Sequence, residues 1–151
     1  MPGTKKENIT IRRMTRDDID AVLLLDRKIG GGKSSMTYRD MIVTDPGGPL
    51  DLSFVAEIED KVIGFILAKL VYVYIPLSEV CLIHGTVVDP KYQGSHVGSK
   101  LFNHLFDHCQ LEDIYTVRAL VSDSDTDLRR FVEHLGFHRS KIINYDKTFE
   151  S

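Results

Sequence analysis

The stretch from residue 80 to residue 109 constrains the fold of this 151-residue chain more than any other. An apolar, β-rich run over 80–88 is followed by Asp89-Pro90, by a loop of small residues and by an amphipathic pattern over 97–109 that predicts a helix. A helix that follows a strand through a short loop is a crossover connection, so we expect the next apolar run, 114–121, to lie parallel to residues 80–88. The sheet is therefore predicted to be partly parallel.

The rest of the chain alternates between short helix and strand patterns. Further strands are expected at 9–14, 52–57, 62–74 and 141–149, and further helices at 16–28, 38–43 and 126–135. Thr15 and Asp18 have the spacing of a capping box at the start of the first helix, and Gly30-Gly31-Gly32 ends it. The order predicts a single domain over 1–151, of the mixed α/β (α+β) class, with a mostly antiparallel central sheet flanked by helices.

Composition disfavours several classes of function. The net charge of −3 and the ordinary content of hydrophobic (42%) and charged (27%) residues predict a folded chain with no general attraction to nucleic acid or to anionic membranes. The N-terminus lacks a signal-peptide pattern and no apolar run reaches the ~18 residues of a membrane helix, so we expect a cytoplasmic protein. Cys81 and Cys109 lie in apolar stretches without C-x-x-C spacing, which favours buried reduced thiols, and no metal is expected.

The loop over 93–99 has the composition of a phosphate-binding site. Gly94, Ser95 and Gly98 are small enough to let a ligand approach the backbone. Successive backbone N–H groups, together with the positive end of the following helix, would point to one spot. That spot suits a pyrophosphate group.

This loop resembles the acyl-CoA-binding motif of the GCN5-related N-acetyltransferase (GNAT) family, whose signature is Gln/Arg-x-x-Gly-x-Gly/Ala and which reads QGSHVG at 93–98. The preceding Asp-Pro-Lys-Tyr at 89–92 is also similar to the family, and FVEHLGF at 131–137 resembles the end of its last helix. The resemblance covers nearly the whole chain. It implies the acyl-CoA N-acyltransferase fold, acetyl-CoA as co-substrate and an amine acceptor of unknown identity, in a monomer or homodimer.

The resemblance also implies how acetyl-CoA is held. The backbone N–H groups expected at the pyrophosphate are those of Gln93, Gly94, Ser95, His96, Val97, Gly98 and Ser99. Those of Val87 and Val88 are expected to pair with the pantetheine arm like an added strand, and that of Val88 to polarise the thioester carbonyl.

A general base is expected, because an amine attacks a thioester only when it is neutral. His84 is the first candidate: it lies on the strand that leads into the loop, where the resemblance to arylalkylamine-type members places a histidine base, and imidazole titrates near neutral pH. The alternative interpretation is a histidine that only packs in the sheet. Glu79 is the second candidate, since some members use a glutamate of this strand through water. The two side chains face opposite sides of a regular strand, unless a bulge changes the phase.

Two positions depart from the family pattern. His96 stands where the signature has its first glycine, and Val132 stands where many members have the tyrosine that protonates the departing thiolate. Tyr92, Tyr115 and Tyr145 are candidate replacements, or tyrosines that only pack by their rings. Two functions follow: an N-acetyltransferase that works by direct attack in a ternary complex, or an acyl-CoA-binding sensor or weakened pseudo-enzyme of the same fold.

Overall fold

The structure is a computed structural model that describes residues 8–30, 36–73 and 78–150. It divides into two compact units, residues 1–120 and 121–151, which are described separately below. The predicted glycine link at 31–32 lies outside the described residues.

The first unit is built on a sheet in the order β1-β2-β3-β4-β5. Its strands are β1 (Thr10–Arg13), β2 (Phe54–Ile58), β3 (Lys61–Val73), β4 (Ser78–Val88) and β5 (Val117–Ala119). The first four strands pair antiparallel and β5 pairs parallel to β4, so both the predicted hairpin and the predicted crossover are confirmed. β5 is shorter than predicted, because the N–H of Ile114 is still bonded to the end of the preceding helix.

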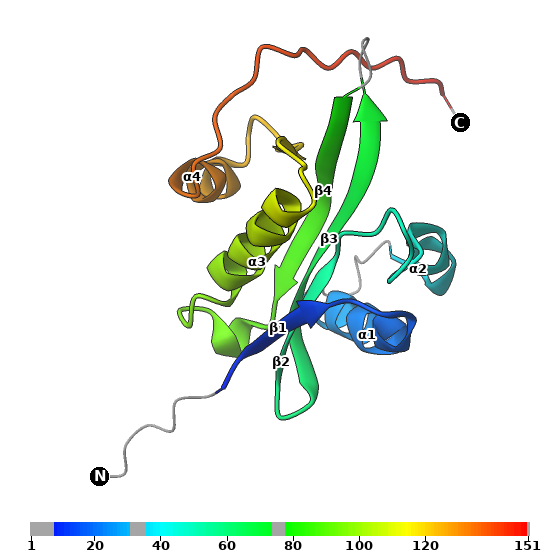
Figure 1. Cartoon of the computed structure of the whole chain (residues 1–151), viewed down its shortest axis with the longest axis vertical. Helices are drawn as coiled ribbons and strands as arrows, with labels where there is room; N and C mark the ends of the chain where they lie inside the picture. The colour runs from blue at the N-terminus through cyan, green and yellow to red at the C-terminus, as the bar shows by residue number, and fades with distance from the viewer. Residues whose placement is uncertain (1–7, 31–35, 74–77, 151) are drawn as a thin grey trace. The chain divides into compact units, whose positions relative to one another are not determined.

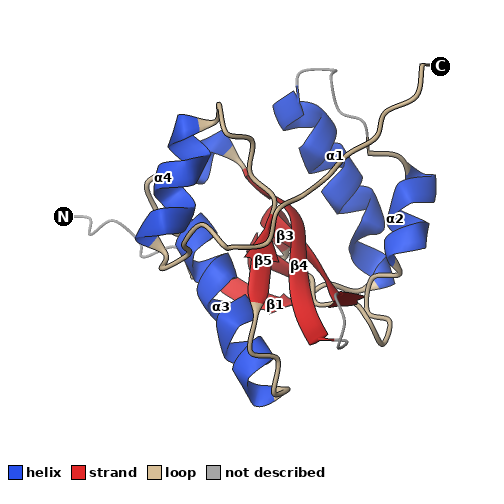
Figure 2. Ribbon diagram, turned by 90° about the horizontal axis from the view of Figure 1, so that it is seen from above, coloured by secondary structure: helices blue, strands red, loops and turns tan. Residues whose placement is uncertain are grey.

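Helices cover both faces of this sheet. They are the short 3₁₀ turns η1 (Arg16–Asp18) and η2 (Pro90–Tyr92), and the α-helices α1 (Ile19–Gly30), α2 (Tyr38–Thr44) and α3 (Val97–Leu111). Figure 2 shows α3 on one side of the strands and α1 and α2 on the other. Figure 1 shows the crossover from β4 through α3.

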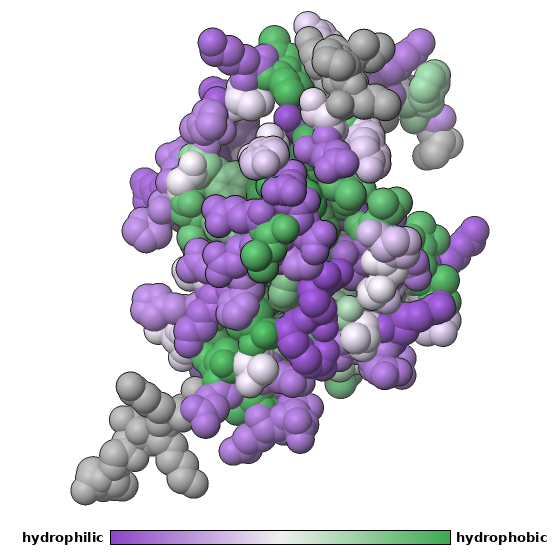
Figure 3. All heavy atoms as spheres, viewed as in Figure 1, coloured by the Kyte–Doolittle hydropathy of each residue, from purple (hydrophilic) through white to green (hydrophobic). Residues whose placement is uncertain are grey.

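Each face of the sheet buries its own apolar side chains. On the side of α1 and α2, Val22 of α1 packs with Phe65 and Leu67 of β3. On the other side, α3 comes close to β3 at Gly64, where an added Cβ would lie 3.3 Å from Cγ1 of Val97 and 3.1 Å from a backbone carbonyl. The glycine therefore allows the helix to pack against the strand. In the view of Figure 3, hydrophilic and hydrophobic residues are interspersed over the surface.

The second unit contains one described helix, α4 (Thr126–His134). The carboxylate of Asp125 accepts the N–H of Leu128 (3.1 Å) at its start, and Gly136, with φ of +98°, follows its end. Residues 137–150 form neither helix nor strand, so the predicted strand at 141–149 is wrong.

The error has a physical reason. Ile142, Ile143, Tyr145 and Phe149 suggested a strand by residue type, but all four are exposed. A strand also needs a ladder partner for its backbone groups, whereas the N–H of Ile142 bonds locally to Oγ of Ser140. Residue type alone therefore does not produce a strand in this segment.

Candidate functional site

The loop between β4 and α3 has a tightly turned backbone. The carboxylate of Asp89 accepts the N–H of Lys91 (3.1 Å) at the start of η2, and the N–H of Ser95 donates to the carbonyl of Tyr92 (3.1 Å). Two residues are left-handed: Gly94 with φ of +93° and His96 with φ of +60°. His96 is the residue immediately before the first turn of α3. The predicted phosphate loop is thus a compact turn that leads directly into a helix N-terminus.

Several N–H groups of this loop are available to a ligand. The first backbone bond of α3 runs from the N–H of Lys100 to the carbonyl of His96 (3.0 Å). Within the described part of the chain, no acceptor bonds the N–H groups of Gly94 or of 96–99. Free N–H groups at a helix N-terminus, added to the helix dipole, attract anionic oxygen atoms. The loop therefore provides the donors that a pyrophosphate requires.

Gly94 and His96 both have left-handed backbone conformations, but only His96 carries a side chain. At Gly94 an added Cβ would meet no atom within 4 Å, so the glycine serves the left-handed backbone and leaves the surface open. His96 takes a left-handed conformation with an exposed side chain, at a cost of about 1 kcal/mol for a residue with a Cβ.

The edge of β4 that faces away from β3 is open before the loop. β5 pairs only with 81–83, so the described strands leave the second half of β4 without a partner on that edge. The N–H of Asp89 donates to the carbonyl of Ile63 (2.8 Å), and N–H directions alternate along an antiparallel ladder. The N–H of Val87 is therefore directed toward β3, and that of Val88 toward the open edge. Of the two residues predicted to pair with pantetheine, only Val88 presents its N–H there.

Asp89 and Lys28 connect the loop to α1. Nζ of Lys28 lies 3.0 Å from Oδ2 of Asp89, whose side chain is only 1% exposed. The N–H of Lys91, and then Lys28, hold the pKa of Asp89 below its usual range. The carboxylate is thus charged and fully bonded, and it orients the turn that begins the phosphate loop. Lys28 was not predicted, because it contacts a residue 61 positions away in the sequence.

His84 lies at a β-bulge. Leu67 pairs with Gly85 and the next residue of β3, Ala68, pairs with Ile83, so His84 is the extra residue of β4. Its side chain reaches solvent. Partial burial, and then the positive charge of Lys69, lower the pKa of His84 below the usual value, which keeps the imidazole neutral near pH 7.

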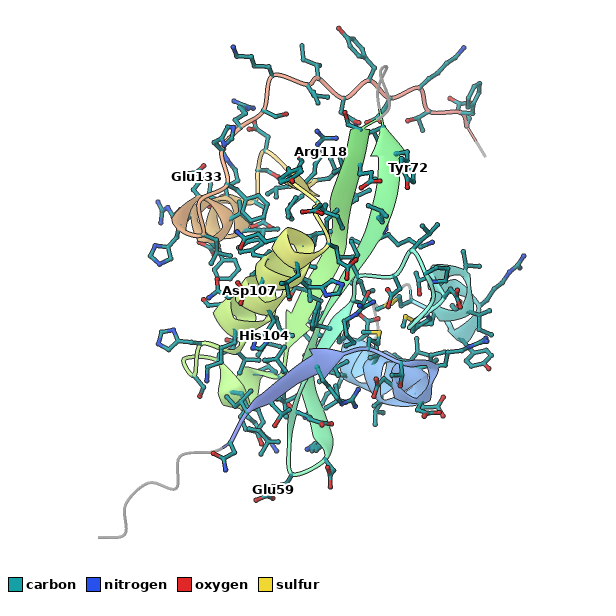
Figure 4. The ribbon with its side chains drawn as sticks, in the orientation of Figure 1. Glu59, Tyr72, His104, Asp107, Arg118 and Glu133 are labelled. Atoms are coloured by element: carbon teal, nitrogen blue, oxygen red, sulfur yellow. The ribbon has the colours of Figure 1, made fainter. Side chains whose placement is uncertain are left out.

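Glu79 lies near the start of β4. It shares its face with Cys81 and Ile83 by alternation, and His84 follows Ile83 as the extra residue of the bulge. Five residues also separate them by about 16 Å along the strand. The carboxylate of Glu79 accepts the hydroxyl of Tyr72 (3.4 Å). Figure 4 shows that Tyr72 lies near one end of β3, whereas Glu59 lies near its other end. The structure therefore does not bring Glu79 and His84 together.

The tyrosines differ in position. Tyr92 lies in η2, at the phosphate loop, and is half-buried. Tyr115 is 88% exposed and its hydroxyl donates to Asp113 (3.4 Å). In the second unit, Tyr145 is exposed, and Val132 is buried with its carbonyl bonded to the N–H of residue 137. Of the three tyrosines, Tyr92 is the one that belongs to the loop itself.

Lys69 is a charged neighbour of His84 that was not predicted from the sequence. The sequence did contain a sign of its importance, because Lys69 is the one charged residue in the otherwise uncharged run 62–73. Its proximity to His84 depends on the register of β3 and β4, which the sequence does not give.

The described residues contain no cluster of three or more metal-ligating side chains that could hold a metal ion. Across those same residues, no helix is long and apolar enough to span a bilayer.

Comparison with known proteins agrees with this geometry. The profile of the acetyltransferase (GNAT) family matches residues 23–137. An uncharacterized N-acetyltransferase of Methanocaldococcus jannaschii is 26% identical over 145 residues, which cover 89% of this chain and 62% of the relative. The chain thus spans less than two thirds of that relative's length.

Solved structures share the fold. AAC(6')-Iy, in complex with a bisubstrate analogue of CoA and acetylneamine, has a TM-score of 0.78 at 19% identity, over 94% of this chain and 99% of that one. The ribosomal-protein-S18-alanine N-acetyltransferase of Escherichia coli has a TM-score of 0.72 at 20% identity, over 89% and 80% of the two chains.

Proposed function

Because this chain belongs to the acetyltransferase (GNAT) family, we propose that it is an N-acetyltransferase that transfers the acetyl group of acetyl-CoA to a primary amine. The observation that carries the proposal is the loop between β4 and α3. Its left-handed turn ends at a helix N-terminus whose first N–H groups have no acceptor among the described residues. Such a loop binds a pyrophosphate through the backbone.

The residues around the loop fit acetyl-CoA. Donors over 93–99 would hold the pyrophosphate, and the open edge of β4 would hold the pantetheine arm as an added strand. When bound, acetyl-CoA supplies an activated thioester. The N–H of Val88 is suited to polarise the thioester carbonyl, because it points to the same edge.

His84 is the residue proposed to prepare the acceptor. Its lowered pKa keeps the ring neutral, so it can take a proton from the ammonium group of the acceptor. The free amine then attacks the carbonyl carbon of the thioester directly in a ternary complex, the carbon–sulfur bond breaks, and the thiolate departs. Tyr92 is the proposed proton donor to the thiolate, since it lies at the loop.

A thiol-release assay tests this proposal. The purified chain is mixed with acetyl-CoA and a panel of alkylamines, amino acids, polyamines, aminoglycosides and peptides, and free thiol is followed together with the mass of each acceptor. Amine-dependent thiol release with a gain of one acetyl group supports the proposal. Thiol release at the buffer rate with every amine contradicts it.

A second candidate is a sensor that binds acyl-CoA without turnover. It is favoured by Val132, which carries no ionisable group, and by the side chain of His96 in the loop. Calorimetric titration with acetyl-CoA distinguishes the candidates when combined with the assay. A sensor binds acetyl-CoA and releases no thiol, whereas failure to bind acetyl-CoA contradicts both candidates.

A further inference from the structure

Lys69 and His84 lie on adjacent strands, close enough for the charge of Lys69 to act on the imidazole. Lys69 pairs with Leu82, two residues from His84, so the two side chains are diagonal neighbours on adjacent strands. Nζ of Lys69 donates to the carbonyl of Val43 (3.4 Å), near the C-terminal end of α2, which fixes the side of the sheet on which it lies. An acceptor amine within hydrogen-bond reach of His84 therefore lies beside a cation.

The charge of Lys69 is not neutralised by an ion pair among the described residues. No described carboxylate lies within 4 Å of Nζ. Asp51 stands opposite Lys69 in an isolated bridge, but its carboxylate accepts the N–H of Gly47 (2.9 Å) and the hydroxyl of Ser53 (2.7 Å). The acid is thus engaged in its own turn, and the ammonium group of Lys69 retains two donors for a ligand beyond its bond to Val43.

We propose that Lys69 is a specificity-determining residue that selects an acceptor carrying a carboxylate near its amine, such as an amino acid or an acidic peptide terminus. The inference rests on the proposed function and on His84 as the base. A carboxylate on the acceptor would form a charge-assisted hydrogen bond with Nζ while the amine lies at the imidazole. A polycationic acceptor would instead place a second positive charge beside Lys69, which is unfavourable.

This inference separates the chain from some of its structural neighbours. An aminoglycoside acetyltransferase in complex with sisomicin shares the fold at 16% identity, with a TM-score of 0.75. Shared fold does not determine the acceptor, because specificity lies in the side chains of the site. Lys69 indicates a zwitterionic acceptor here instead of a polycation.

The test compares matched acceptors. Amino acids of increasing length, from glycine to 6-aminohexanoate, are each paired with the alkylamine of the same length, and spermidine represents the polycations. The value of kcat/KM, corrected for the neutral fraction of each amine, is measured for the wild type, Lys69→Met, Lys69→Glu and the control Lys61→Met. Lys61 is exposed at the other end of the same strand, about 26 Å away.

For at least one length, the wild type is expected to prefer the amino acid over its alkylamine by at least tenfold. Lys69→Met should remove that preference, Lys69→Glu should reverse it toward spermidine, and Lys61→Met should retain it. Acetyl-CoA affinity, measured for every variant, shows that the variants are folded. Equal rates for amino acids and alkylamines, or an unchanged preference in Lys69→Met, would overturn the inference while leaving the acetyltransferase itself intact. If none of the amines in the panel causes thiol release, the proposed function is overturned, and this inference with it.

Discussion

The predicted phosphate loop (93–99) and the bulge region around His84 and Lys69 are built in different ways. The loop presents backbone N–H groups, whose positions depend on left-handed turns at Gly94 and His96. The bulge region presents two side chains, whose proximity depends on how β3 and β4 are paired. We therefore expect changes of backbone conformation in the loop to alter acetyl-CoA binding. Changes of side-chain charge in the bulge region should instead alter the reaction with the acceptor.

The largest expected effect is loss of His84, the proposed base. At pH 7 an alkylamine with a pKa near 10 is only about a thousandth neutral, and general-base assistance is typically ~10²–10⁴-fold. His84→Ala should lower kcat/KM by a factor in this range at neutral pH, leave acetyl-CoA affinity nearly unchanged, and recover partly as the pH rises. Steady-state rates from pH 6 to pH 10 measure this.

Glu79→Gln is the matched control for that prediction. Glu79 lies about 16 Å from His84 along β4 and accepts the hydroxyl of Tyr72, so its variant should change kcat/KM much less. If Glu79→Gln is the more damaging change and His84→Ala has little effect at any pH, the roles are reversed. His84 would then be a strand residue without a catalytic part.

The next effect concerns the backbone of the loop. Gly98 is in the first turn of α3, and its N–H has no acceptor among the described residues. Gly98→Leu places a bulky side chain where a ligand must approach the backbone, so acetyl-CoA affinity should fall at least tenfold, or about 1.4 kcal/mol. Asn103→Leu adds the same side chain to an exposed position of the same helix and should leave the affinity unchanged. Calorimetric titration measures both, and equal affinities would remove the phosphate-loop assignment.

A smaller effect is expected at the carboxylate that orients the loop. Asp89→Ala removes both the cap of η2 and the partner of Lys28. Loss of a capping side chain costs about 1 kcal/mol of stability. The ion pair between Asp89 and Lys28 contributes less than a fully buried ion pair, because Lys28 is half exposed. Acetyl-CoA affinity should fall about three- to tenfold, whereas Lys28→Met should produce a smaller fall. An Asp89→Ala variant of normal affinity would show that the turn holds its shape without this carboxylate.

A shift in pH dependence is expected at Lys69. In the proposed function the neutral form of His84 is the base, so kcat/KM should fall as the pH drops through its pKa. That pKa is lowered by partial burial and by Lys69, so the fall should occur below the usual pH of about 6.5. Lys69→Met removes one cause, hence the acidic limb should move to higher pH. If the acidic limb of the pH profile of kcat/KM lies at the same pH in Lys69→Met and in Lys61→Met, the charge of Lys69 does not affect the pKa of His84.

These two regions also differ in how far the sequence predicted them. The loop was predictable because its signals are local: small residues, a proline turn and a helix start follow one another over 89–99. The proximity of Lys69 to His84 was not predictable, since it depends on pairing across strands and on the bulge. The direction of the Val87 N–H depends on the same register.

The smallest effect is expected at His96, and it decides whether this side chain belongs to the site. In the first interpretation the side chain folds away from the ligand, and His96→Gly relieves a left-handed conformation that costs about 1 kcal/mol. The variant should then bind acetyl-CoA as tightly as the wild type or up to a fewfold more tightly, at every pH, and should unfold at a slightly higher temperature. In the second interpretation the imidazolium contacts a phosphate, so His96→Gly would weaken binding only at low pH, where histidine is protonated. We favour the first, because the ring is exposed and makes no cap hydrogen bond at the start of α3 that would hold it over the free N–H groups. Titrations at pH 5.5 and pH 8 separate the two, and a loss of affinity confined to pH 5.5 would make His96 a side-chain contact in a loop that otherwise binds through its backbone.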